Sequence, residues 1–372
     1  MKWIFWASAG MIAYTYLGYL GWLWVRARLR GRPVNRIPHT PELSVCMVVR
    51  NEEQNLRKKI HNLVSLNYPQ DKITFVIVCD GSTDSTAAML SEITDPRFRT
   101  LLLPESKGKA FGLNEAIRIA QGDIVLFTDA RQYIEPEGPR LLMENFADAN
   151  VGCASGELML GDPAAGEVSK GMGLYWRIEK MVRELESASG SVVGATGAFY
   201  SARRKLLAPI PAETILDDVY LPMQIARQGR RVVFDDRARA WDSPNLGEKK
   251  EFTRKVRTLS GNYQLVQSQP WLLSSGNPLL FEFVSHKVLR LLVPFALSLA
   301  LVSSFFLPES LYRVALVLQL AFYSLSLLGF AHLKSGPLAK AADAALTFVV
   351  LNTAAIVAFK NFVTGRRTVW VR

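Results

Sequence analysis

Cysteine is scarce in this chain, with only three residues in 372. Cys46 and Cys79 lie inside apolar runs with the character of strands, and Cys153 begins another such run. Their spacing does not match a zinc site, and it does not suggest a disulfide framework. We therefore expect three buried free thiols in a protein of a reducing compartment.

Acidic residues are fewer than basic ones, at 33 against 44, which gives a formal net charge of +11. Such an excess raises the question of nucleic acid as a partner. No basic stripe is interleaved with exposed aromatic residues, as nucleic-acid binding would require. Many of the basic residues instead flank apolar segments, where anionic membrane lipids are the simpler partner. We expect contacts with membrane lipids and no nucleic-acid binding.

Charge is absent from Trp3 to Val25, a run long enough to cross roughly 30 Å of hydrocarbon. A cleaved signal peptide would have a shorter apolar run and a small-residue cleavage site. Arginines follow here instead, at Arg26, Arg28, Arg30 and Arg32. We expect a retained membrane anchor with its N-terminus outside and residues 33–280 in the cytoplasm.

Three further apolar stretches lie near the C-terminus, at about 288–307, 311–331 and 343–359. Together with the anchor they predict a multi-pass protein of the cytoplasmic membrane. Three crossings would leave the C-terminus outside, whereas its basic residues argue for the inside. These residues are Lys360, Arg366, Arg367 and Arg372. The topology of the C-terminal part stays open.

The segment between the apolar ends alternates strand-like and helical patterns, and repeats are absent. We expect strands over Leu43–Arg50, Ile73–Asp80, Phe98–Leu103 and Gly122–Asp129. We expect helices over Glu52–Leu66, Asp84–Ile93, Lys107–Ala120, Pro136–Ala149 and Gly171–Ser187. This alternation predicts an α/β fold with right-handed crossovers and an open, doubly wound, mostly parallel sheet.

Polar and charged residues follow three of these strands. The three segments are Arg50-Asn51-Glu52, Asp80-Gly81-Ser82 and Asp129-Ala130-Arg131. In an open α/β sheet, ligands bind beyond the carboxyl ends of the strands. The sequence therefore predicts a site for a polar ligand at this edge.

Six sequence blocks then occur in a fixed order. They are VRNEEQNL (49–56), VCDGSTDST (78–86), SKGKAFGLNEAI (106–117), FTDA (127–130), GATGAFYSARR (194–204) and LDDVYLPMQIARQGRRVVFDDRARAWD (216–242). Over roughly residues 43–260 the set resembles the family 2 glycosyltransferases of the GT-A fold, and among them the membrane-bound cellulose, hyaluronan and poly-N-acetylglucosamine synthases. The resemblance implies a Rossmann-like GT-A sheet with transmembrane helices at both ends, a UDP-sugar donor and a glycan acceptor.

On this basis we expect four regions. They are an N-terminal anchor and basic flank (1–32), a cytosolic GT-A domain (33–260), interfacial helices (261–286) and C-terminal transmembrane helices (287–372).

The resemblance also assigns donor-binding residues. Arg50, Glu52, Asp80 and Lys109 match nucleotide-binding positions, although Asp80-Gly81 taken alone is equally typical of a turn. Asp129 matches the first aspartate of the DxD motif, which binds Mg²⁺ or Mn²⁺ on the diphosphate. The second aspartate is replaced by Arg131, which cannot bind a metal but can contact phosphate oxygens.

Asp217 and Asp218 match the family's Glu-Asp pair. The resemblance makes Asp218 the base that deprotonates the acceptor hydroxyl, with Asp217 orienting the acceptor or the helix, and in-line attack inverts the anomeric configuration. The alternative is a helix N-cap. On the acceptor side we expect Gly197 and Ala198. We also expect Trp176 there with Tyr175 and Glu179, unless these three only pack their helix on the core.

The processive synthases carry a QxxRW motif after the base. Arg257 matches its arginine, but the glutamine and tryptophan are missing. Processive synthesis is therefore one hypothesis, and single transfer to a polyprenyl phosphate or glycolipid is another. A third is an inactive sugar- or nucleotide-binding subunit, against which the retained Asp80, Asp129 and Asp218 argue.

Overall fold

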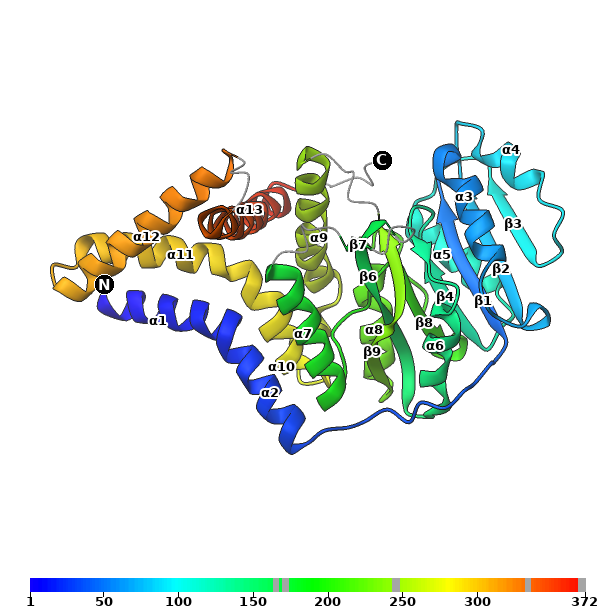
Figure 1. Cartoon of the computed structure of the whole chain (residues 1–372), viewed down its shortest axis with the longest axis horizontal. Coiled ribbons are helices and arrows are strands. Elements are labelled where there is room, and N and C mark those ends of the chain that lie inside the picture. The colour runs from blue at the N-terminus through cyan, green and yellow to red at the C-terminus, as the bar shows by residue number, and fades with distance from the viewer. Residues whose placement is uncertain (163–166, 169–173, 243–247, 332–335, 367–372) are drawn as a thin grey trace.

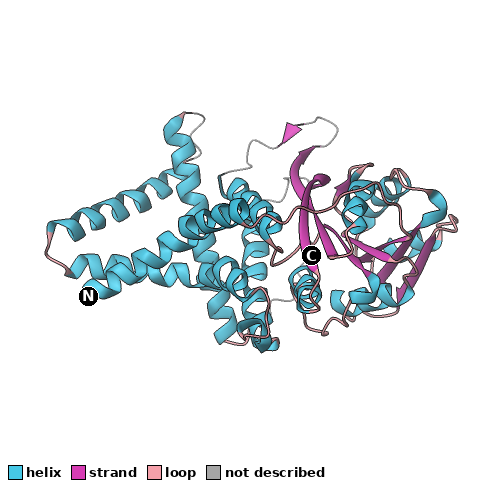
Figure 2. Ribbon diagram, turned by 90° about the horizontal axis from the view of Figure 1, so that it is seen from below, coloured by secondary structure: helices cyan, strands magenta, loops and turns pink. Residues whose placement is uncertain are grey.

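The fold has a sheet-containing part and a helical part side by side (Figures 1 and 2). A computed structural model describes residues 1–162, 167–168, 174–242, 248–331 and 336–366. The predicted positions Arg367, Arg372, Gly171 and the side chain of Tyr175 lie outside what it describes.

The first half of the sheet is parallel, as predicted. Its strands are β1 (Leu43–Val49), β2 (Ile73–Asp80), β3 (Phe98–Leu103) and β4 (Ile124–Thr128), in the order β3-β2-β1-β4. The crossovers contain α3 (Glu53–Val64), α4 (Thr86–Ser91) and α5 (Lys109–Ile119). β1 is buried at every position because helices cover both faces of the sheet, which explains its continuous apolar run.

The second half of the sheet is mixed, so the expectation of a mostly parallel sheet was wrong there. It contains β5 (Tyr133–Ile134), β6 (Val151–Asp162), β7 (Glu167–Val168), β8 (Phe199–Arg203) and β9 (Arg231–Asp242). β8 runs antiparallel to both β4 and β6, while β9 runs parallel to β6. Among the described strand pairings, four are parallel and four antiparallel. The α/β fold class itself is confirmed.

Alternate residues of each central strand pack into separate apolar clusters on the two faces. In β1, Cys46 and Val48 enter one cluster, and Val45 and Met47 enter the other. Helices α6 (Gly138–Glu144) and α8 (Asp217–Arg227) also contribute to these clusters. All three cysteines are buried and free.

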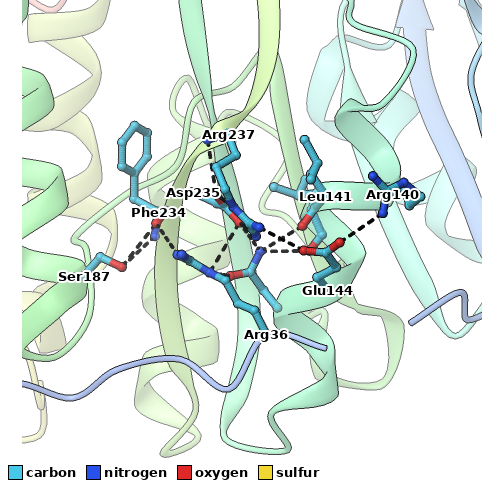
Figure 3. A network of polar contacts seen from close by, with 10 residues as sticks. Arg36, Arg140, Leu141, Glu144, Ser187, Phe234, Asp235 and Arg237 are labelled. Carbon is cyan, nitrogen blue, oxygen red and sulfur yellow. Dashed lines mark hydrogen bonds and ion pairs between the residues drawn. The ribbon is translucent and has the colours of Figure 1, made fainter. Parts of the chain in front are cut away.

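The chain between the N-terminal helix and β1 is pinned to the sheet by a polar network (Figure 3). Arg36 donates to Asn145 Oδ1 at 3.0 Å and lies 3.5 Å from Asp235 Oδ2. Asp235 is fully buried in β9 and also accepts two bonds from Arg237, at 3.0 and 2.9 Å. Burial opposes ionisation, but the bonds from Arg237 and Asn145 outweigh it and lower the pKa of Asp235.

We expect Asp235→Ala to destabilise the protein by about 3 kcal/mol, because Arg36 and Arg237 lose a buried counter-charge. Asp236→Ala is the matched control. The Asp236 side chain is 47% exposed and its ion pair with Lys180 measures 3.5 Å, so its loss should cost less than about 1 kcal/mol. Chemical unfolding of the full chain in detergent measures both. Equal losses would show that the network does not stabilise the fold.

Three C-terminal helices are long and apolar enough to cross a membrane, as predicted. They span Leu280–Phe306, Ser310–Gly329 and Pro337–Val363, with mean hydropathies of 2.0, 1.6 and 1.8. The first comprises α10 (Leu280–Phe283), a π-helical turn (Val284–Val288) and α11 (Leu289–Phe306), and the others are α12 and α13.

The N-terminal helix consists of α1 (Lys2–Ala13), a π-helical turn (Tyr14–Gly18) and α2 (Tyr19–Leu29). It is not among the candidate spans, because its tryptophan, tyrosine and glycine residues lower its hydropathy. The membrane anchor expected there stays a prediction. α1 nevertheless packs beside α11 (Figure 1), and Phe5 of α1 contacts Tyr312 of α12 edge to face.

Two long helices connect the sheet to the helical part of the molecule. They are α7 (Leu174–Ser189), which contacts α2, and α9 (Glu248–Ser268), which contacts α13. The boundary expected at residue 260 falls within α9, and that at residue 286 falls within the π-helical turn. The four-region division remains a prediction.

Candidate active site

The loops after β1 and β2 meet at one edge of the sheet, as the strand-end rule predicts. Asn51 donates from its backbone N–H to Ser82 Oγ at 3.0 Å, and its Oδ1 accepts from the Thr83 N–H at 2.8 Å. Asn51 has a φ of 53°, in the left-handed region that asparagine tolerates better than most residues. Two of the three predicted segments are therefore hydrogen-bonded together.

Asp80, at the end of β2, is bonded to the loop that begins α5. It is fully buried, and its carboxylate accepts from Ser106 Oγ at 2.7 Å and from the N–H groups of Lys107 and Gly108 at 2.7 and 3.1 Å. These bonds hold the loop that begins α5. In this arrangement Asp80 positions Lys109, and its predicted contact with a nucleotide stays a prediction.

Lys109 is the centre of the site. Its ammonium lies 3.2 Å from Asp129 Oδ1 and 3.4 Å from Asp217 Oδ1, so it connects the end of β4 to the start of α8. Burial disfavours the charge, but Asp129, Asp217 and Asp218 together raise the pKa of Lys109 above its usual value. The structure thus brings together three residues that the sequence assigned to one site.

Asp217 and Asp218 form the first turn of α8, after Leu216 at the N-cap position. Neither makes a side-chain capping bond, so the N-cap alternative is not confirmed. Burial and then the neighbouring Asp217 raise the pKa of Asp218 to about 6, against the opposing charge of Lys109. A carboxylate with such a pKa is ionised at neutral pH and still accepts a proton readily, as a general base requires.

The loop 194–198 lies directly against Asp218. Ala195 donates from its backbone N–H to the Asp218 carbonyl at 2.7 Å. A Cβ added at Gly197 would lie 2.8 Å from Asp218 Oδ2, so only glycine leaves room for this carboxylate. Ala198 follows as a buried residue immediately before β8.

We expect Gly197→Ala to lower the transfer rate by roughly 100-fold with little effect on donor binding, because it displaces the base by an ångström or so. Gly194→Ala is the control, since its Cβ would meet the Val219 side chain at 3.2 Å rather than a carboxylate. Steady-state kinetics and nucleotide titration separate the two effects. Equal losses in both variants would contradict the assigned contact.

Arg131 pairs with the buried Asp242 at the end of β9. The two bonds, from Nε and from one terminal nitrogen, measure 3.1 and 3.0 Å. Arg254 of α9 also approaches Asp242, at 3.4 Å. Among the described residues this contact comes from Arg254, three positions before Arg257, and the predicted role of Arg257 toward the diphosphate stays a prediction.

Lys59 supports the site and was not predicted. It is 2% exposed, and its ammonium donates to Thr128 Oγ1 at 2.9 Å and to the Gln132 carbonyl at 2.7 Å, directly beside Asp129. Burial lowers the pKa of Lys59 to about 7, and Asp129 opposes this shift. The only sequence signal is its place on the apolar face of α3, between Leu56 and Leu63.

The remaining predicted donor residues lie at the end of β1. Arg50 follows β1, and its Nε is buried without a hydrogen-bond partner among the described residues. Glu52 is the N-cap residue of α3 and accepts from Asn55 Nδ2 at 2.8 Å. Their predicted roles toward a nucleotide stay predictions.

Trp176 and Glu179, two of the residues expected near the acceptor, both lie on α7. Trp176 is half-buried on the helix, and its predicted role stays a prediction. Glu179 is buried and bonds to His286 Nε2 at 3.0 Å and to Arg290 at 2.6 Å. These bonds join α7 to the first candidate span and favour the alternative that Glu179 packs its helix, while its role toward an acceptor stays a prediction. Glu179 also forms an ion pair with Arg183, at 3.5 Å.

Asp129 was also tested as a metal ligand. Its side chain is 41% exposed, and the described residues contain no group of three His, Cys, Asp or Glu side chains suited to a metal. Mg²⁺ bound to phosphates commonly takes only one or two protein carboxylates and completes its shell with phosphate oxygens and water. A single exposed carboxylate at this position fits that pattern.

Comparison with known proteins supports the interpretation that the chain contains a glycosyltransferase domain. Residues 44–210 match the model of the family "Glycosyl transferase family 2". The chain is 23% identical over 227 residues to the poly-beta-1,6-N-acetyl-D-glucosamine synthase of Staphylococcus aureus, a match that covers 58% of this chain and 53% of the synthase. It is 22% identical over 260 residues to the synthase of Staphylococcus epidermidis, which covers 65% of this chain and 61% of that protein. The chain thus spans little more than half the length of these relatives.

A solved structure extends the likeness of the fold to nearly the whole chain. It is a mannosyltransferase from Pyrobaculum calidifontis in complex with GDP-mannose and Mn²⁺, with a TM-score of 0.73 and 20% identity. The alignment covers 97% of this chain and 99% of the mannosyltransferase. Residues 44–210 of this chain thus match a glycosyl transferase family 2 domain, and its fold is similar to that of the mannosyltransferase.

Proposed function

We propose that the chain is an inverting, membrane-bound glycosyltransferase that moves a hexosyl or N-acetylhexosaminyl group from a nucleotide-sugar to a glycan or lipid acceptor. A UDP-sugar is the expected donor, by resemblance to the synthases. The observation that carries the proposal is the linked set Asp129–Lys109–Asp217, with the base candidate Asp218 beside it.

In the proposed reaction Asp218 accepts the proton of an acceptor hydroxyl. The oxygen attacks the anomeric carbon of the donor from the side opposite the diphosphate. A new glycosidic bond forms as the bond to the diphosphate breaks, and the configuration at the anomeric carbon inverts. Gly197 leaves room for the Asp218 carboxylate next to the acceptor.

Positive side chains lie where the leaving diphosphate would accumulate charge. Lys109 is held there by Asp129 and Asp217, and Arg131 is held nearby by Asp242. Fixed cations of this kind favour departure of the diphosphate. A bound Mg²⁺ or Mn²⁺, with Asp129 as its protein ligand, would neutralise the same charge.

The acceptor class has two candidates. The names of the staphylococcal relatives favour a growing poly-N-acetylglucosamine chain. The incomplete QxxRW motif favours a single transfer to a lipid. The setting of Asp218 supports the second candidate as well. The positive charges of Lys287 and Arg183 oppose the rise of its pKa, and Lys287 lies near the start of the first candidate span, so the base candidate lies close to the proposed membrane helices.

The placement in the membrane also belongs to this proposal. Three candidate spans follow the sheet, and the predicted cytoplasmic arginines precede it. We propose that residues 33–260 act at the cytoplasmic face of the cell membrane, with nucleotide-sugar supplied from the cytosol.

The full chain in lipid nanodiscs, with Mg²⁺ or Mn²⁺, tests the proposal against a panel of UDP- and GDP-sugars. Release of nucleoside diphosphate identifies the donor, and product size separates a polymer from a single addition. We expect turnover with one donor or a few related donors. Nucleotide binding without transfer to any glycan or lipid acceptor would instead identify an inactive binding subunit.

A further inference from the structure

A second, strongly basic pocket lies outside the proposed active site. It measures about 360 Å³ and is lined from α2, the chain after α7, the end of α8 and the segment that begins the first membrane helix. Its charged lining residues are Arg26, Arg30, Arg32, Arg230, Arg231 and Glu282. Five positive charges against one negative charge leave a net charge of +4 in one small space.

Some of these arginines already have hydrogen-bond or ion-pair partners within the chain. Arg231 is committed to backbone carbonyls, including those of Gly190 at 3.0 Å and Arg32 at 2.8 Å. Arg26 donates from Nε to Ser189 Oγ at 3.0 Å and forms an ion pair with Glu282. These contacts tie α2 to α7 and to the first membrane helix.

Arg230 donates to the Ala149 carbonyl at 2.9 Å, and the remaining positive groups have no partner among the described residues. The second terminal nitrogen of Arg26 is buried and makes no hydrogen bond there. The exposed side chains of Arg30 and Arg32 likewise have no hydrogen-bond or ion-pair partner in the described part of the chain. A buried unpaired guanidinium nitrogen is costly unless a ligand satisfies it.

The chemistry and the location both restrict that ligand. Guanidinium groups present a fork of N–H donors that matches phosphate oxygens. The pocket lies at the end of the N-terminal helix and beside α10, which begins the candidate span Leu280–Phe306, and the two are neighbours in Figure 1. Basic pockets at this level of a membrane protein meet the phosphates of the lipid surface.

We propose that this pocket binds the phosphate headgroup of an anionic phospholipid. Ala226 and Gly229 at the end of α8 line the same pocket, and α8 begins with Asp217 and Asp218. A lipid bound here therefore contacts the helix that carries the base, at its opposite end, and bridges it to the membrane helices.

The test uses the full chain in neutral detergent, titrated with dihexanoyl phosphatidic acid, dihexanoyl phosphatidylcholine and inorganic phosphate. We expect the acidic lipid to bind most tightly. Arg30→Ala should weaken its binding by about fivefold, and Arg30→Ala/Arg32→Ala by roughly 25-fold. Arg28→Ala is the matched control: it removes the same charge two residues away, from a side chain that lies 4.6 Å over the Trp24 ring and does not line the pocket.

Binding by the Arg28→Ala variant within twofold of the unaltered chain supports the pocket. An equal loss in the Arg28→Ala and Arg30→Ala variants would reduce the effect to general surface charge and overturn the proposal. Phosphate binding as tight as that of the acidic lipid would assign the site to a soluble anion and overturn the lipid. Thermal unfolding without lipid checks that the variants are folded, which we expect because neither Arg30 nor Arg32 has a side-chain partner to lose.

Discussion

Asp218→Asn is expected to abolish transfer and to stabilise the protein at the same time. Loss of a general base lowers the rate by about 10²- to 10⁴-fold. The same carboxylate is partly buried beside Asp217, which raises its pKa to about 6. Above that pH its charge costs stability, so a neutral amide should raise the unfolding free energy by roughly 1 to 3 kcal/mol.

The pH dependence of stability follows from the same shift. Because the pKa of Asp218 is higher in the folded chain than its ordinary value of 3.8, the folded state holds the extra proton between pH 3.8 and about 6. The contribution of Asp218 to stability therefore falls as pH rises through this window and is constant above it. The advantage of Asp218→Asn should be full above pH 6 and should vanish toward pH 4.

Asp217→Asn is the matched control for this prediction. Its carboxylate lies 3.4 Å from the Lys109 ammonium, so its loss should destabilise the protein rather than stabilise it. Denaturant unfolding of the three proteins at pH 7.5, with transfer assays alongside, measures the contrast. Destabilisation by both substitutions would show that the negative charge of Asp218 does not lower the free energy of unfolding. It would also remove the physical argument for Asp218 as the base.

Lys109→Met is expected to have the second large effect. The substitution keeps most of the volume but leaves Asp129 and Asp217 without the ammonium that lies 3.2 and 3.4 Å from them. We expect a loss of about 2 to 4 kcal/mol in unfolding free energy, because the buried Asp217 and the partly exposed Asp129 lose their counter-charge. Transfer should fall by roughly 10²- to 10³-fold, as for removal of one preorganised electrostatic group.

Lys107→Met provides the control for Lys109→Met. Lys107 is two residues away and exposed, and its ammonium lies 5.0 Å from the centre of the Phe111 ring. Its removal should change stability by less than about 1 kcal/mol and leave the transfer rate within twofold. If Lys107→Met were as damaging as Lys109→Met, the loss would arise from the loop before α5 and not from the Asp129–Lys109–Asp217 set.

The parts of the site that the sequence predicted share one property. Asn51, Asp80 and Asp129 each end a run of buried β-branched residues, and parallel strands bring such ends to one edge. Asp217 could be added only through the family resemblance, since no local pattern connects the start of α8 to β4. The structure supplies that connection through the Lys109 ammonium.

The features that sequence reasoning missed depend on contacts between distant segments. The Arg131–Asp242 pair joins residues 111 positions apart. Lys59 contacts the end of β4 from α3, although a lysine on a helix is usually exposed to solvent. Asp80 and the glycine after it are typical of a turn, and the local sequence does not indicate that the 106–108 loop covers this carboxylate. Periodicity gives no information on such pairings.

The mixed half of the sheet was missed for a related reason. β9 contains several charged residues, such as the buried Asp235, which pairs with the exposed Arg237. Such a strand lacks the continuous apolar run of β1. The N-terminal helix shows the reverse case: absence of charge predicted a span, but its aromatic and glycine residues leave it outside the set of candidate spans.

The central claim is that Asp218 is the base of a sugar transfer, and the pH dependence of transfer tests it most directly. The measurement is the initial rate of nucleoside diphosphate release with acceptor present, from pH 5 to 8, for the full chain and for Asp218→Asn. We predict a rate that falls below about pH 6, the pKa of Asp218, and a variant at least about 100-fold slower at pH 7.5. A variant that keeps more than a tenth of the rate at pH 7.5 would contradict the assignment of Asp218 as the base.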